Sequence, residues 1–172
     1  EFEFIEQSIS FDFYQFTDEN FPPRYCAMTP RMQARIPKCF GWQIIPNYDI
    51  YIWIDSSMAV TNKDTVKWFL DQLGDKDAAF FKHPDRGTIE EELNFIEKKI
   101  KEKNYYLTPR YSNEFGKEEL EEILAADYPL KTPLIASTAF VYRNRPNIHD
   151  MMKEWWYHIS RYHIVDQLGL PY

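Results

Sequence analysis

The stretch Asp49-Ile50-Tyr51-Ile52-Trp53-Ile54-Asp55 places five apolar residues in a row between two carboxylates. A short, uninterrupted apolar run is typical of a central β-strand that is covered on both faces. In an open α/β sheet, ligands bind outside the carboxyl ends of the strands. Asp55 is therefore predicted to lie where a carboxylate can hold a divalent cation or a ribose hydroxyl. The alternative is that Asp55 only caps the turn through Ser56 and Ser57.

The chain on both sides of this strand alternates between strand-like and helix-like patterns. Apolar residues recur at helical spacing after Thr88, and Gly74 stands where a helix is expected to end. This alternation predicts one α/β domain over residues 1–172, Rossmann-like, with a mainly parallel central sheet flanked by helices. The expected strands are 11–16, 49–55, 77–82 and 134–142, and the expected helices are 30–36, 62–73, a long helix that begins at Thr88, 117–126 and 147–162.

The composition excludes several classes of protein and site. The five glycines are isolated from one another, so the chain has no glycine-rich phosphate loop. With 20 Lys and Arg against 27 Asp and Glu, the net charge is -7, and nucleic acid is not an expected partner. No apolar stretch approaches the roughly 20 residues that span a bilayer, so no transmembrane segment is expected.

The cysteines bear on the compartment. Cys26 and Cys39 are the two cysteines of the chain, which is too few for a disulfide framework. No Cys/His cluster has the spacing of a zinc site. A reducing compartment is therefore expected, either the cytoplasm or the cytoplasm of a host cell, and an excised lumenal domain also fits.

Several cations lie where a phosphorylated ligand could reach them. Arg31, Arg35 and Lys38 are three or four residues apart, which puts them on one side of the predicted helix. They are candidates for clamping a diphosphate, and a solvated helix face is the alternative. His83 and Arg86 follow the end of a predicted strand, so they are candidates for contacting a donor or an acceptor.

Motifs spread along the chain resemble those of glycosyltransferases with the GT-A fold. The run Asp49–Ser57 is similar to their hydrophobic strand and DxD motif, with Asp55 as the first acid. Phe16-Thr17-Asp18 is similar to their FTD motif. Three further matches follow in the same chain order as in these enzymes, and these are the basic segment Arg31–Lys38, the segment Leu134–Asn144 with Trp155-Trp156, and Asp166-Gln167-Leu168.

Two further segments narrow the resemblance to one family. His83-Pro84-Asp85-Arg86, with Glu90 and Glu91 after it, and the closing segment Asp166–Tyr172 resemble the TOD1-like glycosyltransferase-like family, formerly a domain of unknown function, DUF616. The chain departs from the GT-A pattern at its start, because only ten residues precede Phe11 and the usual first strand is poorly matched. The domain is therefore expected to lack that strand or to be a piece of a longer protein.

The resemblance implies a metal-assisted hexosyltransferase. Its donor would be a nucleoside-diphosphate sugar, with a UDP-sugar favoured, and its acceptor a hydroxyl of a glycan or another molecule. In GT-A enzymes the DxD carboxylates bind the ribose and a divalent cation, which neutralises the diphosphate leaving group. The implied cofactor is Mn²⁺ or Mg²⁺, with Asp55 as a ligand and Ser57 where the second acid is usual. His163 or His158 would supply the histidine that such enzymes often recruit.

The C-terminal segment carries the candidate catalytic residues. Asp166 is a candidate base for an inverting transfer, or positions the reacting hydroxyls together with Gln167 in a retaining one. A turn-capping role for Asp166 is the alternative. Trp155 and Trp156 cannot both face the core from one helix. Trp156 is a candidate for the acceptor groove, and a second core contact is the alternative. Tyrosines in loops or at helix edges could stack on a sugar ring, and these are Tyr105, Tyr106 and Tyr111.

Two other functions fit the same residues. Because Ser57 replaces an acid, the chain could be a non-catalytic module that binds a carbohydrate or a nucleotide sugar. A hydrolase that uses Asp55 and Asp166 is the weaker alternative, and it predicts turnover of a substrate without a nucleotide.

Overall fold

The computed structural model describes residues 3–24, 26–129, 131–162 and 165–172. The chain forms two compact units. The first unit comprises Glu1–Phe80 and Thr138–Met152, and the second comprises Phe81–Ser137 and Lys153–Tyr172. Each unit combines segments that are distant in sequence. The expectation of one domain over residues 1–172 stays a prediction.

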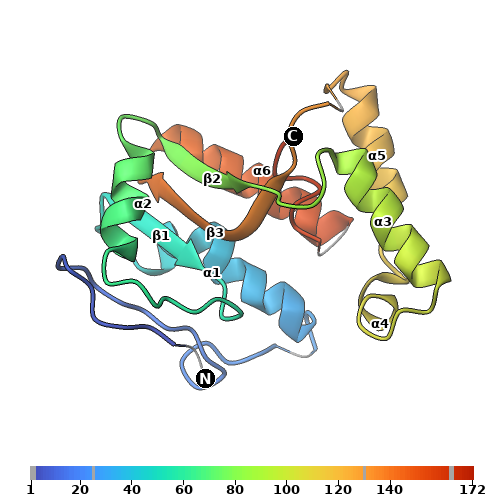
Figure 1. Cartoon of the computed structure of the whole chain (residues 1–172). Helices are drawn as coiled ribbons and strands as arrows, with labels where there is room; N and C mark the ends of the chain where they lie inside the picture. The colour runs from blue at the N-terminus through green and yellow to red at the C-terminus, as the bar shows by residue number, and fades with distance from the viewer. Residues whose placement is uncertain (1–2, 25, 130, 163–164) are drawn as a thin grey trace. The chain divides into compact units, whose positions relative to one another are not determined.

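The helices and strands agree closely with the expected order (Figure 1). The apolar run after Asp49 is confirmed as a strand, and so are the two later strands. The strands are β1 (Ile50–Ile54), β2 (Ala78–Lys82) and β3 (Ile135–Arg143). The expected central place of β1 is wrong, because β3 is the middle strand and the residues of β1 are half-buried. The helices are α1 (Pro30–Ile44), α2 (Thr65–Leu73), α3 (Ile89–Lys101), α4 (Thr108–Tyr111), α5 (Gly116–Ala125) and α6 (Pro146–Arg161).

The three strands form an antiparallel sheet in the order β1-β3-β2, so they do not supply the mainly parallel sheet that the sequence predicts. Ile50 lies opposite Arg143, and Ile54 lies opposite Ala139. The Arg143 amide donates to the carbonyl of Asp77, while the His83 amide donates to the carbonyl of Leu134, so β2 also runs opposite to β3. After the helices that follow β2, the chain returns to the C-terminal end of β2. From there β3 runs antiparallel to β2.

In the first unit, α2 packs its apolar face against the strands. Phe69 and Leu73 form a buried cluster with Ala139 and Val141. The alternating isoleucines of β1 pack against this cluster, which explains why the strand needs its apolar run. The helix ends at Gly74, whose φ of 49° lies in the left-handed region that a glycine adopts without strain, as predicted.

Helix α1 is longer than predicted. Thr29 caps it as expected, because its hydroxyl accepts from the amide of Met32. The helix was expected to end before Pro37, but it continues to Ile44 with a kink at Phe40, where φ is -121° and ψ is 21°. Pro37 removes one helical hydrogen bond, but the helix runs on past it, and the kink lies three residues later. The continuation brings Lys38 into the buried part of the unit.

In the second unit, α3 contributes the main apolar face, as its spacing predicts. Ile89, Leu93 and Ile96 are buried in a cluster that also contains Leu134, which directly precedes β3, and residues from α5 and the C-terminal segment. The Thr88 hydroxyl caps the helix by accepting from the amide of Glu91. The Glu91 carboxylate accepts from the amide of Gly87, one residue earlier than a standard capping box requires.

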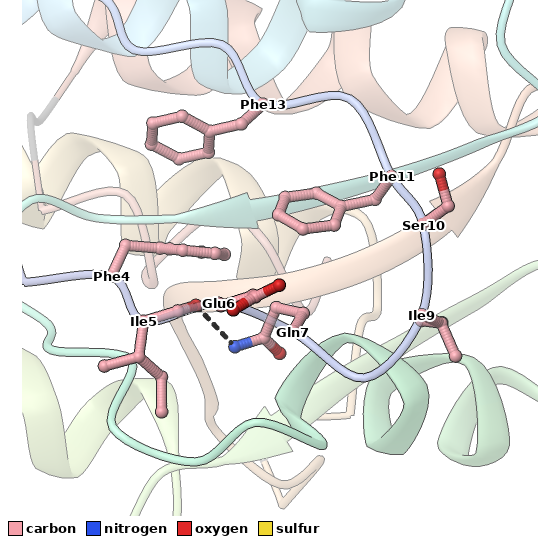
Figure 2. Close-up of a pocket in the computed structure, with 8 residues that line it drawn as sticks. All are labelled: Phe4, Ile5, Glu6, Gln7, Ile9, Ser10, Phe11 and Phe13. Carbon is pink, nitrogen blue, oxygen red and sulfur yellow. Dashed lines mark hydrogen bonds between the residues drawn. The ribbon is translucent and has the colours of Figure 1, made fainter.

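The N-terminal segment does not form the strand expected over residues 11–16. Instead, the segment loops back on itself, and the Phe11 and Phe13 rings pack against Phe4 at centroid distances of 5.5 and 4.9 Å (Figure 2). A run of aromatic residues favours a strand, but a strand also needs a hydrogen-bonded neighbour. The loop encloses a shallow pocket of about 310 Å³ that is lined by residues between Phe4 and Phe13. None of the predicted site residues lines it.

Candidate functional site

Asp55 lies directly after β1 in the first unit, and its carboxylate is held by two donors. The Lys38 ammonium lies 3.2 Å from Oδ1 and 3.4 Å from Oδ2. The indole N–H of Trp53 donates to Oδ1 at 2.6 Å. The Asp55 amide donates to the carbonyl of Thr138 on β3, which fixes the backbone. The carboxylate therefore has a set orientation at the end of the strand.

Lys38 differs in its surroundings from the other two cations of α1. Its side chain is fully buried, whereas 23% of the Asp55 side chain is exposed. A buried ammonium must be paired, since desolvation of an isolated charge costs several kcal/mol or more. Arg31 is exposed and Arg35 is half-buried. Lys38 therefore contacts Asp55, and the predicted clamp of three cations stays a prediction.

The surroundings of Asp55 do not fit a divalent cation. Hard cations take about six oxygen ligands, often from several carboxylates. Here a single carboxylate already carries an ammonium, and Ser57 is neutral and lies in an exposed turn. In the described ranges of the chain, no three His, Cys, Asp or Glu side chains are grouped as a metal would need. His163, the predicted third ligand, lies outside the described residues.

In the second unit, Asp166 is buried and anchored. Its side chain accepts a hydrogen bond from the Ser137 hydroxyl at 2.7 Å, and its backbone carbonyl accepts from the indole N–H of Trp155 at 2.6 Å. The residue is only 4% exposed. The two tryptophans of α6 differ as expected, because Trp155 is buried and Trp156 is half-buried. The arrangement suits a carboxylate that positions the C-terminal segment.

Three predicted site residues of the second unit share one network, and Glu92 is its centre. Gln167 donates its side-chain amide to Glu92 Oε1 at 2.8 Å. The other Glu92 oxygen accepts from Arg86 Nε, and Arg86 Nη2 lies 3.1 Å from His83 Nε2. Glu92 is only 3% exposed. The network brings together residues from the end of β2, from α3 and from the C-terminal segment.

Sequence reasoning missed Glu92, although a signal for it exists. Residue 92 lies between Ile89 and Leu93 on the apolar face of α3, where a carboxylate is unfavourable unless it is paired. The motif that resembles the family instead includes Glu90 and Glu91, which follow the capping threonine. The structure leaves Glu90 exposed and uses Glu91 in the helix cap.

The imidazole of His83 faces N–H donors at both ring nitrogens. Nδ1 accepts from the amides of Asp85 and Arg86, and Nε2 lies against the Arg86 guanidinium, which has only donors to offer. A second proton on the ring would meet another donor. Burial and, next, the positive charge of Arg86 lower the pKa of His83 from its ordinary value of 6.5. His83 is therefore neutral at pH 7, and its acceptor nitrogen, Nδ1, is already used by the two backbone amides.

We expect an NMR pH titration to place the pKa of His83 below 6.5. The ring Cε1–H resonance reports the titration, and its absence in His83→Gln assigns it. Because the folded-state pKa is depressed, the stability that His83 contributes is present above pH 6.5 and is lost as the pH falls through the folded-state value. A titration midpoint at or above 6.5 would contradict the described contacts.

His158 is not a free metal ligand in the second unit. Its Nδ1 lies 3.1 Å from Glu119 Oε1, and both side chains are buried. Burial raises the pKa of the Glu119 carboxyl. The pair lies against Gly169, and no larger residue fits there without a shift. An added Cβ would lie 2.7 Å from His158 Cβ and 2.8 Å from Glu119 Oε1. The histidine therefore serves the packing of the C-terminal segment.

The tyrosines that were expected to stack on sugars divide into two groups. Tyr105 is 89% exposed, and Tyr106 is exposed with the Arg110 guanidinium 3.6 Å from its ring centroid. Both precede α4 and remain open to a ligand. Tyr111 instead packs against the apolar cluster of the second unit, so its ring is less accessible to a sugar than those of Tyr105 and Tyr106.

Comparison with known proteins gives one match. A family model described as "TOD1/MUCI70, glycosyltransferase-like domain" matches residues 24–172. No curated protein and no solved structure matches the chain. In the described part of the chain, none of the helices combines the length and the apolar character that crossing a bilayer requires.

Proposed function

Because the chain belongs to the TOD1/MUCI70 glycosyltransferase-like family, we propose that it transfers a hexosyl group from a nucleoside-diphosphate sugar to a hydroxyl of a glycan or another acceptor. The family match over residues 24–172 is the observation that carries this proposal. A UDP-sugar is the favoured donor. The acceptor oxygen attacks the anomeric carbon, the bond from that carbon to the diphosphate breaks, and the hydroxyl proton passes to a carboxylate or to the departing diphosphate.

The end of β1 is the proposed donor site. Asp55 is partly exposed, and Lys38 and Trp53 hold its carboxylate in place. Its remaining lone pairs can accept a hydrogen bond from a hydroxyl of the ribose or of the sugar. Arg31 and Arg35 precede Lys38 on the same helix and are the proposed partners of the diphosphate. A preorganised acceptor of this kind binds a hydroxyl without first ordering its own side chain.

Within the second unit, the network around Glu92 holds the residues proposed for catalysis. Gln167 and Arg86 are oriented by the same carboxylate, and Asp166 holds the segment that carries Gln167. Neutral His83 lies at the edge of this network, where its Nε2 faces Arg86. Trp156, which is half-buried on α6, is the proposed acceptor contact. Asp166 is proposed as a positioning residue, because a base must reach the hydroxyl proton.

Mn²⁺ or Mg²⁺ stays a prediction from the family resemblance. Asp55, Ser57 and His163 would be its ligands, and its chemistry would be to offset the charge of the diphosphate. The ammonium of Lys38 already neutralises Asp55, so no step of the proposal is assigned to a metal.

Measuring product release from a panel of UDP-sugars and acceptor glycans tests the proposal. We expect turnover with at least one UDP-sugar and a loss of UDP affinity of about tenfold or more in Asp55→Asn, because a carboxylate binds a hydroxyl more strongly than an amide does. Asp49→Asn is the matched control, since Asp49 is exposed at the opposite end of β1. Equal UDP affinity in the wild type and Asp55→Asn would contradict the role of Asp55.

A non-catalytic binding module is the second candidate, and the pairing of Asp55 with Lys38 favours it. Such a module would bind UDP or a glycan and leave it chemically unchanged, so no product would be released. Binding of UDP-sugars by calorimetry without any turnover in the panel would select this function over transfer.

A further inference from the structure

We propose that Lys38 is the resident cation of the Asp55 site and that this site binds its nucleotide donor without a divalent metal. The inference rests on the proposed function for its ligand, a nucleoside-diphosphate sugar. Its structural basis is independent of that function, because it comes from the contacts of one buried ammonium with one carboxylate.

The first step of the argument is a balance of charge. A site with two acids carries two negative charges, which a divalent cation offsets before an anionic diphosphate can approach. Here Ser57 stands where the second acid would be, so Asp55 is the single carboxylate of the motif. The Lys38 ammonium offsets the negative charge of Asp55. A nucleotide therefore meets less repulsion from this carboxylate than from an unpaired one.

The second step is geometric. The Lys38 ammonium lies within 3.4 Å of both Asp55 oxygens, and Trp53 holds one of them from another side. A metal bound at the same oxygens would lie close to the ammonium, and two cations repel one another strongly where water is excluded. The exposed part of the carboxylate remains able to accept a hydroxyl. The geometry therefore suits a sugar or ribose hydroxyl better than a metal ion.

The third step concerns burial. The Lys38 side chain is fully buried, and Pro37 and Cys39 on either side of it are buried as well. A metal could take over Asp55 only if this ammonium lost its carboxylate partner or moved into water, and both changes are unfavourable for a buried charge. Lys38 therefore acts as a positioning residue, since it offsets and orients Asp55 without reaching the ligand itself.

Two titrations of the whole chain test the inference. In the first, free Mn²⁺ is followed by EPR in the presence of the wild type, Asp55→Asn and Lys38→Met. We expect the wild type and Asp55→Asn to retain the same amount of Mn²⁺, and we expect Lys38→Met to retain more. Mn²⁺ binding by the wild type that Asp55→Asn abolishes would overturn the inference.

The second titration measures UDP affinity by calorimetry, in EDTA and in Mn²⁺. We expect the wild-type affinity to agree within about twofold between the two conditions, because the neutralising charge belongs to the protein. In Lys38→Met we expect an affinity about tenfold lower in EDTA and partial recovery with Mn²⁺. Lys63→Met, which removes an exposed lysine of the same unit, is the matched control. A loss of about tenfold or more on adding EDTA to the wild type would overturn the inference.

The two proposals fail in different ways. If UDP binds only with Mn²⁺, the donor site stands and the role of Lys38 falls. If no nucleotide binds in either condition, the proposed function falls, and the Mn²⁺ titration still decides whether Lys38 excludes a metal from Asp55. The wild-type measurements in EDTA and in Mn²⁺ need no variant. Both proposals can therefore still be refuted if Lys38→Met does not fold.

Discussion

Asp55→Ala is expected to destabilise the first unit by about 3–5 kcal/mol, because the buried Lys38 ammonium loses the Asp55 carboxylate as a partner. The Trp53 indole also loses its acceptor. Urea unfolding followed by tryptophan fluorescence measures the change. Lys38→Met combined with Asp55→Ala should recover most of the lost stability, because the buried charge is then absent as well.

Asp49→Ala is the control for this prediction. Asp49 is exposed one residue before β1, so its removal should change the free energy of unfolding by less than about 0.5 kcal/mol. A destabilisation below about 1 kcal/mol in Asp55→Ala would mean that Lys38 finds another partner or reaches water. In that case the orientation of Asp55 by Lys38 would also lose its support.

Glu92→Ala is expected to destabilise the second unit by about 3 kcal/mol and to lower transferase activity. The substitution leaves the Arg86 guanidinium and the Gln167 amide without their shared acceptor in a buried place. Arg86 can still stack on the Phe95 ring, whose centroid lies 4.3 Å away, so part of its packing survives. Thermal and urea unfolding report the stability, and steady-state kinetics report the activity.

Two further variants separate positioning from simple destabilisation. Glu92→Gln keeps an acceptor for Gln167 and loses the charge opposite Arg86, so it should be milder than Glu92→Ala. Glu90→Ala alters an exposed residue of the same helical turn and should leave stability within about 0.5 kcal/mol. Normal turnover in a folded Glu92→Ala variant would contradict the proposal that Glu92 orients the residues proposed for catalysis.

Local patterns predicted the elements that carry the sites. The apolar run before Asp55 indicated a strand, and the structure has β1 over Ile50–Ile54. The spacing of Ile89, Leu93 and Ile96 indicated the buried face of α3, which the structure also has. These features depend on neighbours within a few residues, so a single sequence contains the information. The family resemblance rested on such segments and is confirmed over residues 24–172.

The direction of β3 was not predictable from the same patterns. Alternating strands and helices are compatible with either strand direction, because periodicity reports burial and not the path of the connecting chain. The strand expected over residues 11–16 failed for a related reason. Its aromatic residues favour an extended chain, but the rings of this segment pack against Phe4, and the segment gains no strand partner.

By itself, the sequence determined where the strands of the sheet and most of the helices lie, and that a carboxylate follows β1. Only the tertiary structure decided the partners of the polar residues. Lys38 pairs with Asp55 across 17 residues, and Glu92 bonds Gln167 across 75. The physical reason is that a buried charge is stable only beside its partner, and chain closure over such separations leaves no local pattern. The same closure pairs Lys38 with Asp55, while the contact of Lys38 with a phosphate stays a prediction.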